Sequence, residues 1–174
     1  QLTACGVVWA ESADELPEPG DFLAWQQASV TGRRDALRHH SPWPAVAPWP
    51  TVSILLSSHR SDRLAHALSM VRAQDYPNLQ VIVVLHGDDD FVSHHTPNVH
   101  QSLVGWSGDL VVMGVSPEQT LGHALAAASA RAEGELLAKM DDDDFYSATH
   151  IWDLVLARMY SGAQIVGKAL DWIY

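Results

Sequence analysis

From residue 51 onward, short apolar runs alternate with segments that carry apolar side chains at helical spacing. In the runs nearly every position is apolar, which is typical of strands buried on both faces of a parallel sheet. The expected strands are Thr51–Leu56, Leu79–Leu85, Leu110–Val115 and Glu135–Met140, with Ile165 and Val166 beginning another. This alternation predicts an α/β domain with a Rossmann-like, mostly parallel sheet and helices on both faces.

Three helices are expected between and after these strands, each with a start signal. Ser61 is a plausible N-cap for the first, and Ser116 with Pro117 opens the second, which runs to Arg131. Ser147 is expected to cap the third, through Tyr160. The stretch between the second and third strands, which contains His94, His95 and His100, is weakly patterned, and the sequence assigns no element to it.

The first 50 residues have a different pattern. Asp21 can cap a helix over Phe22–Leu37, and residues 41–50 hold four prolines and two tryptophans. We therefore predict a helical appendage with a Pro/Trp linker over residues 1–50 and a main domain over residues 51–174. Because the chain begins without Met and ends inside an apolar run, we expect that main domain to be incomplete at its C-terminus.

Charge and composition narrow the function classes. The chain of 174 residues has a net charge of −11, which argues against nucleic acid or an anionic membrane as the main partner. The single cysteine, Cys5, excludes an internal disulfide. No apolar run approaches the roughly 20 residues of a membrane span, so we expect a cytoplasmic location, peripheral to a membrane only through parts outside this chain.

Four consecutive carboxylates, Asp141–Asp144, follow the fourth predicted strand. They repel one another, so they need a cation or open water. In open α/β sheets the carboxyl ends of strands form the ligand site, where Ser57–Arg60 and His86–Asp90 should also lie. Oxygen ligands suit Mg²⁺ or Mn²⁺, which can hold a diphosphate. The chain has no Gly-rich phosphate loop. For each acidic run, the alternative to a metal site is a turn whose carboxylates are solvated.

Three segments resemble the nucleotide-binding half of family-2 glycosyltransferases, which have the GT-A fold. They are residues 51–60 (TVSILLSSHR), 74–84 (QDYPNLQVIVV) and 132–144 (AEGELLAKMDDDD). Each segment alone is weak evidence for the family, but the order and spacing of all three are fairly specific to it. The resemblance covers about residues 51–170. One departure is the segment after the second strand, where Leu85-His86-Gly87-Asp88 replaces the usual Asp-Asp-Gly-Ser.

The resemblance implies transfer of a sugar from a nucleotide-sugar donor to a carbohydrate or other hydroxyl acceptor, with inversion. Asp141 and Asp143 match the two acids of the D-x-D motif, which holds Mn²⁺ or Mg²⁺ and the diphosphate. The expected contacts of the nucleotide sugar are Ser57, His59, Arg60, His86, Asp88, Asp141 and Asp142. The family's catalytic base is expected beyond Tyr174.

Within the acidic run, alternation along an extended segment predicts that Asp141 and Asp143 share one face while Asp142 points away. Asp144 is expected to support the N-terminus of the following helix. Three alternatives stay open at this point. The first is a non-catalytic module that binds a nucleotide sugar or a cation, and the second is a metal-dependent hydrolase or phosphotransferase. His94, His95 and His100 could hold zinc.

Overall fold

The computed structural model describes residues 3, 8, 12, 15–40 and 48–168. The chain divides into two compact units, which we call the sheet unit (residues 50–151) and the helical unit (residues 1–49 with 152–174). Each is described by itself. The predicted domain boundaries, 1–50 and 51–174, stay a prediction.

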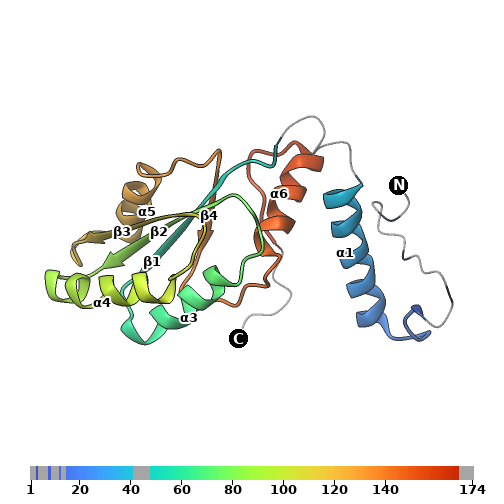
Figure 1. Cartoon of the computed structure of the whole chain (residues 1–174), viewed down its shortest axis with the longest axis horizontal. Helices are drawn as coiled ribbons and strands as arrows, with labels where there is room; N and C mark the ends of the chain where they lie inside the picture. The colour runs from blue at the N-terminus through green and yellow to red at the C-terminus, as the bar shows by residue number, and fades with distance from the viewer. Residues whose placement is uncertain (1–2, 4–7, 9–11, 13–14, 41–47, 169–174) are drawn as a thin grey trace. The chain divides into compact units, whose positions relative to one another are not determined.

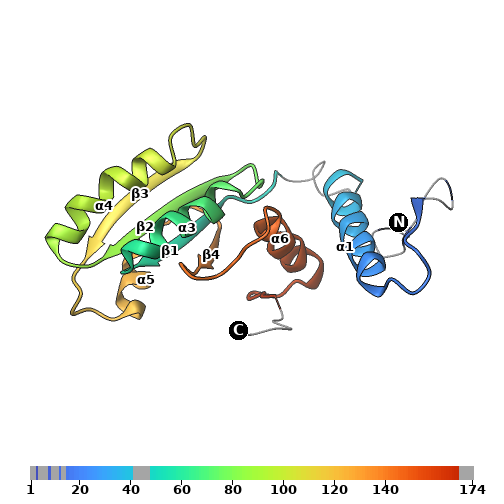
Figure 2. The ribbon, with the colours of Figure 1, turned by 90° about the horizontal axis from the view of Figure 1, so that it is seen from below.

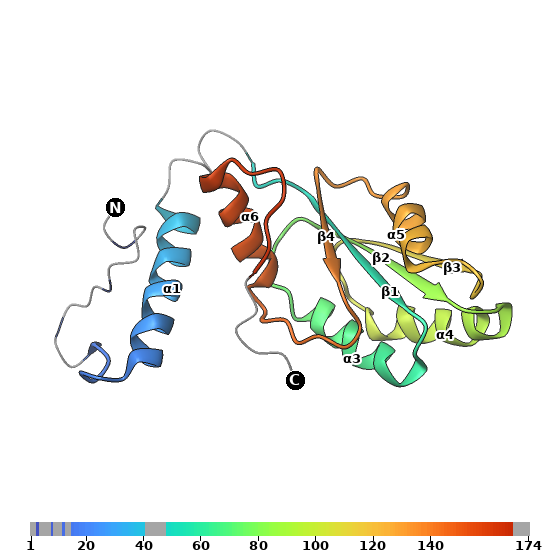
Figure 3. The ribbon, with the colours of Figure 1, turned by 180° about the vertical axis from the view of Figure 1, so that it is seen from behind.

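The sheet unit contains four parallel strands in the order β3-β2-β1-β4 (Figure 3). Their bounds are β1 Val52–Ser58, β2 Leu79–His86, β3 Asp109–Val115 and β4 Leu136–Met140. All four predicted strands are confirmed. The central strands β1 and β2 are buried along almost their whole length, as their continuous apolar runs predicted.

Helices cover both faces of the sheet, which confirms the predicted fold class (Figures 1 and 2). Helix α5 (Leu121–Ser129) packs on one face, where Ala124 and Ala128 contact Leu55, Ile82 and Val84. Helices α3 (Ser61–Arg72) and α4 (Asp89–Ser102) cover the other face, α3 over β1 and α4 over β2 and β3. Small alanines let α5 approach the sheet closely.

The weakly patterned stretch is helix α4, which the sequence did not predict. Only His95 and Val99 of this helix are buried, and such a narrow buried face leaves no apolar period in the sequence. Its N-terminus is nevertheless well capped, because the Asp88 side chain accepts a hydrogen bond from the Phe91 N–H at 2.8 Å.

Two predicted helix starts were placed too early. Ser116 to Gln119 form a turn, in which the Gln119 N–H donates to the Ser116 carbonyl at 3.0 Å. Thr120 then caps α5. Similarly, the Ser147 carbonyl accepts from the His150 N–H at 3.0 Å, and helix α6 spans His150–Ser161. In both places a Ser begins a turn that precedes the helix.

Two smaller corrections concern Ser61 and Ile165. Ser61 is the first residue of α3 rather than its cap, and the cap position is Arg60, which makes no side-chain bond to the helix. Residues 163–168 form no strand, and Ile165 there is 90% exposed, so the predicted strand at Ile165 and Val166 was wrong.

In the helical unit, helix α1 (Phe22–His39) begins where predicted, with the Asp21 side chain accepting from the Ala24 N–H at 3.0 Å. Trp152 of α6 lies edge-on to Trp49, with ring centroids 4.9 Å apart. No helix in the described part of the chain is long and apolar enough to cross a membrane.

Candidate functional site

Because the strands are parallel, the residues after β1, β2 and β4 lie at one edge of the sheet, and two contacts link them. Ser58 Oγ donates a hydrogen bond to Asp142 Oδ2 at 2.6 Å, joining the first segment to the acidic run. The rings of His59 and His86 lie edge to face with centroids 6.4 Å apart, joining the first segment to the second. The structure thus brings together the three segments that the sequence predicted to meet.

The best-defined contact of this site is the ion pair between Arg60 and Asp142. Arg60 Nη2 bonds to Asp142 Oδ1, and Nε donates to Oδ2 at 3.3 Å. Nη2 also lies 3.0 Å from Asp143 Oδ2, so one guanidinium serves two acids.

Asp142 is the buried member of the acidic run, at 5% exposure. Burial alone would raise the pKa of its carboxyl, but hydrogen bonds from Arg60 and Ser58 outweigh burial and leave that pKa below its ordinary value. The hydrogen bonds that Arg60 donates to Asp142, and then to Asp143, raise the pKa of Arg60. Asp142 is therefore ionised, and hydrogen bonds from within the protein stabilise its charge.

Asp141 has a different set of partners. Its carboxylate pairs with the Lys139 ammonium, and its backbone N–H donates to the Tyr146 hydroxyl at 2.8 Å. The Tyr146 hydroxyl in turn donates to Asp144 Oδ2 at 3.2 Å. Burial raises the pKa of Tyr146 to about 12, so the hydroxyl stays protonated at neutral pH. The expected role of Asp144 at the next helix was wrong, because α6 begins only at His150.

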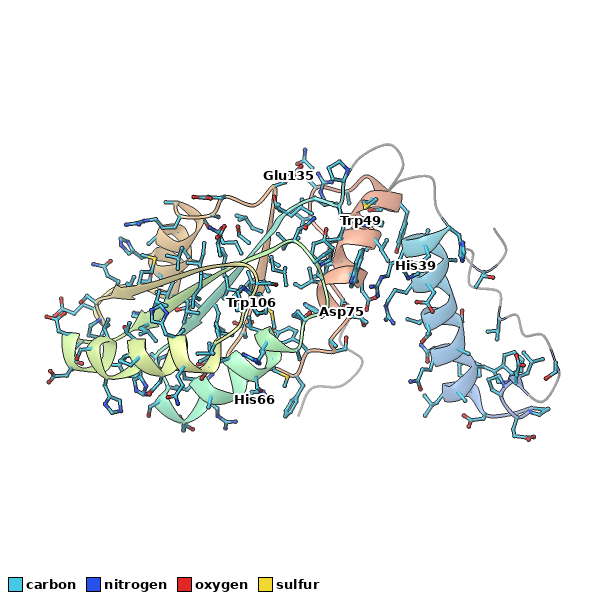
Figure 4. The ribbon with its side chains drawn as sticks, in the orientation of Figure 1. His39, Trp49, His66, Asp75, Trp106 and Glu135 are labelled. Atoms are coloured by element: carbon cyan, nitrogen blue, oxygen red, sulfur yellow. The ribbon has the colours of Figure 1, made fainter. Side chains whose placement is uncertain are left out.

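Helix α3 and the residues just after it contact residues 144–148, at the end of the acidic run and beyond it. The His66 Nε2–H donates to the Asp144 carbonyl at 3.0 Å, and the Phe145 ring lies 4.7 Å from the His66 ring. Further along, Gln74 Nε2 donates to the Ser147 carbonyl at 2.9 Å, and the Asp75 N–H donates to the Ala148 carbonyl at 2.9 Å. Figure 4 labels His66 on α3 and Asp75 beyond its end.

The segment after β2 lies beside a cavity of about 370 Å³, which is lined by Gly87, Asp88, Val92, Gly114, Val115 and Pro117 among others. His86 Nε2–H donates to the Gln119 carbonyl at 3.0 Å. Gly87 has no room for a side chain, since a Cβ there would lie 2.6 Å from the Phe91 ring. Asp88 caps α4, and Asp89 and Asp90 lie in its first turn, where the helix N-terminus favours negative charge.

The histidines of α4 do not form a metal site. In the described residues no group of three or more His, Cys, Asp or Glu side chains could hold a metal ion. His94 and His95 instead lie ring to ring at 4.8 Å, and burial, followed by the charge of His94, lowers the pKa of His95. The zinc alternative is therefore not supported.

Sequence reasoning missed three residues of the site: Ser58, His66 and Tyr146. Ser58 stands beside the predicted Ser57, but only the structure shows that it ends β1 and bonds Asp142. His66 lies one turn from Asp62 on an exposed face of α3, and nothing in the sequence links it to residues 144 and 145. Tyr146 had one usable signal, since it follows the acids directly.

Several solved structures resemble this chain in fold, at low sequence identity. S. aureus TarS 1–349 aligns with a TM-score of 0.52 and 20% identity, over 63% of this chain and 32% of that one. Its complex with UDP-GlcNAc aligns with a TM-score of 0.50 and 21% identity, over 63% and 31%. The mannosyltransferase PcManGT from Pyrobaculum calidifontis, in complex with GDP-Man and Mn²⁺, aligns with a TM-score of 0.49 and 22% identity, over 75% and 42%.

The TarS alignments show the fold, and this chain spans about a third of the length of TarS 1–349. No curated protein sequence matches the chain. The model of the family described as glycosyl transferase family 2 matches residues 53–170, which is more than half of the chain. The chain therefore belongs to glycosyl transferase family 2.

Proposed function

We propose that this chain is the donor-binding part of a glycosyltransferase that moves a sugar from a nucleotide sugar to an acceptor hydroxyl, with inversion at the anomeric carbon. The observation that carries the proposal is the convergence of three segments at the carboxyl edge of a parallel sheet, joined by the Ser58–Asp142 and His59–His86 contacts. Family membership supports the reaction class.

The charge of the acidic run supports a divalent cation. Three of the four carboxylates are paired with two cations: Asp141 with Lys139, and Asp142 and Asp143 with Arg60. Asp144 accepts from the neutral Tyr146 hydroxyl, so the four acids and two cations together carry a charge of −2. Asp141 and Asp143 have side chains that are 41% and 51% exposed, so their oxygens are accessible. Mg²⁺ usually takes one or two carboxylates and completes its shell with water and phosphate oxygens, and this donor set fits that chemistry.

We assign Asp141 and Asp143 to Mn²⁺ or Mg²⁺. A bound ion would supply neutralisation of the charge that develops on the leaving diphosphate. Lys139 and Arg60 are placed to share that task with their own charges, because both already lie against the acids. The remaining donor contacts proposed are Ser57, His59, His86 and Asp88, which lie on or after β1 and β2. Asp88 also lines the 370 Å³ cavity.

The acceptor hydroxyl needs a general base, which we place in sequence beyond Tyr174 or in a partner. Losing general-base help typically lowers the rate by about 10²–10⁴-fold. We therefore expect this 174-residue chain to bind donor and to transfer sugar poorly by itself.

Calorimetric titration of the chain with UDP-GlcNAc, GDP-mannose and a dTDP-sugar, with Mn²⁺ and again with EDTA, tests the proposal. The first donor to try is UDP-GlcNAc, because S. aureus TarS 1–349 has been solved with it. We expect one donor to bind, and binding to weaken when the metal is removed. Absence of binding to every donor would contradict the proposal. Metal-dependent binding with no transfer by a longer chain would favour the non-catalytic module instead.

A further inference from the structure

We propose that Arg60 is a positioning residue for the metal-binding acids, and that Asp142 is its buried anchor rather than a contact of the donor. This inference rests on the proposed function. It changes the assignment of two residues, Arg60 and Asp142, that the family resemblance placed among the donor contacts.

Both carboxylate oxygens of Asp142 already accept hydrogen bonds from within the protein. Oδ1 accepts from Arg60, and Oδ2 accepts from both Ser58 Oγ at 2.6 Å and Arg60 Nε at 3.3 Å. Its 5% exposure places it beneath Asp141 and Asp143, which are far more exposed. A donor could reach Asp142 only by breaking these bonds.

Arg60 connects this anchor to an exposed acid. Its guanidinium is planar and rigid, so fixing Nε and Nη2 on Asp142 also fixes the second direction in which Nη2 can donate. That direction leads to Asp143 Oδ2 at 3.0 Å. Asp143, which is half exposed, thereby gains a defined orientation.

The backbone at Arg60 is held as well. Its N–H donates to Ser58 Oγ at 3.2 Å, and the same hydroxyl donates to Asp142. Arg60 occupies the cap position of α3 without making a side-chain bond to that helix, which leaves its guanidinium available for the acids. The end of β1, the start of α3 and the residues after β4 are thus joined in one network.

Without this network the repulsion between the carboxylates would not be compensated, and residues 141–144 would lose their defined conformation. Holding Asp143 in place before the metal arrives lowers the ordering cost of binding. Residues that orient metal ligands typically contribute about 10- to 100-fold to metal affinity. We assign Arg60 a contribution of that size.

The test uses Arg60→Gln, Arg60→Lys, Asp142→Asn and the double variant Arg60→Gln/Asp142→Asn. Arg63→Gln is the matched control, because Arg63 lies on the same helix and contacts Asp62. Two quantities are measured in each: the backbone ¹⁵N heteronuclear NOE of residues 141–144 in ligand-free protein, and the Mn²⁺-dependent affinity for UDP-GlcNAc, GDP-mannose and a dTDP-sugar.

We expect Arg60→Gln to lower the NOE at residues 141–144 and to weaken affinity about 10- to 100-fold. Asp142→Asn should do the same, and the double variant should be no worse than Arg60→Gln. Arg60→Lys should recover only part of the loss, since an ammonium cannot make the fork. Arg63→Gln should match the parent.

An unchanged NOE in Arg60→Gln would overturn the inference. It would also fail if the losses from Arg60→Gln and Asp142→Asn multiplied in the double variant, because Asp142 would then act independently on the ligand. If the parent bound none of the three donors, the proposed function would fail, and the NOE alone would decide the role of Arg60.

Discussion

Two aspartate–arginine pairs, one in each unit, have similar geometry, but the clusters around them have net charges of opposite sign. In the helical unit, Arg34 Nε and Nη2 bond to Asp153 Oδ1 and Oδ2 at 2.6 and 3.2 Å. In the sheet unit, Arg60 makes the corresponding fork on Asp142. The second partner differs: Asp153 also accepts from Lys168 at 2.8 Å, whereas Arg60 also reaches the acid Asp143.

The difference in second partner changes the charge that each cluster has left. One carboxylate shared by two cations leaves +1 at Asp153, so a further cation has no reason to bind there. At the acidic run, two cations pair with three of the four carboxylates, and the sum of these charges is −2. The same fork is therefore a closed structural contact in the helical unit, and in the sheet unit it belongs to the acidic run that we propose as a cation site.

The largest expected effect is on nucleotide binding, which Asp143→Asn should weaken far more than Asp153→Asn. Asp143→Asn removes a charge that we assign to the metal, so we expect Mn²⁺-dependent donor affinity to fall by more than about 100-fold, beyond the loss typical of an outer-shell partner. Asp153→Asn should leave affinity within about twofold, although it lowers stability. Calorimetry on both variants makes the measurement. Equal losses would show that the acidic run has no special role in binding.

The sequence predicted the sheet well because its central strands β1 and β2 are buried on both faces, and burial leaves an unbroken apolar run, as in Val81–Leu85. It located the acidic run for a similar reason, since consecutive acids after a strand are conspicuous. Alternation predicted that Asp142 points away from Asp141 and Asp143, but the sequence could not show that Asp142 is buried, because its partners Arg60 and Ser58 are brought to it by the fold. Helix α4 was missed because only His95 and Val99 of it are buried, which leaves no apolar stripe in the sequence.

A smaller effect concerns stability and pH at Asp153. Burial alone would raise the pKa of its carboxyl, but hydrogen bonds from Arg34 and then Lys168 outweigh it and lower that pKa below its ordinary 3.8. A lowered folded-state pKa means that the stabilisation is complete above the unfolded-state value and is lost as pH falls through the folded-state value. At pH 7 we expect Asp153→Asn to reduce the free energy of unfolding by about 1–2 kcal/mol.

The measurement is denaturant unfolding of the parent and Asp153→Asn from pH 7 to pH 2. The difference between them should stay constant down to about pH 4 and then shrink below the ordinary value of 3.8. A difference that persisted unchanged at pH 2 would mean that Asp153 stabilises the unit through packing and not through its charge.

The smallest effect comes from removing the exposed cation of each cluster, Lys139 or Lys168, by the same Lys→Gln substitution. Both lysines are partly exposed, at 45% and 40%, and pairs of this kind contribute at most about 1 kcal/mol. Lys168→Gln should therefore change stability by less than that amount and leave Mn²⁺ affinity unchanged. Lys139→Gln frees Asp141 and makes the acidic run more negative, so Mn²⁺ affinity in the absence of nucleotide should rise by up to about fivefold. Titration of Mn²⁺ followed by electron paramagnetic resonance reports the free ion directly in both variants. Weaker Mn²⁺ binding in Lys139→Gln would mean that Lys139 orients Asp141 for the metal, as we propose Arg60 does for Asp143, instead of competing with the metal for it.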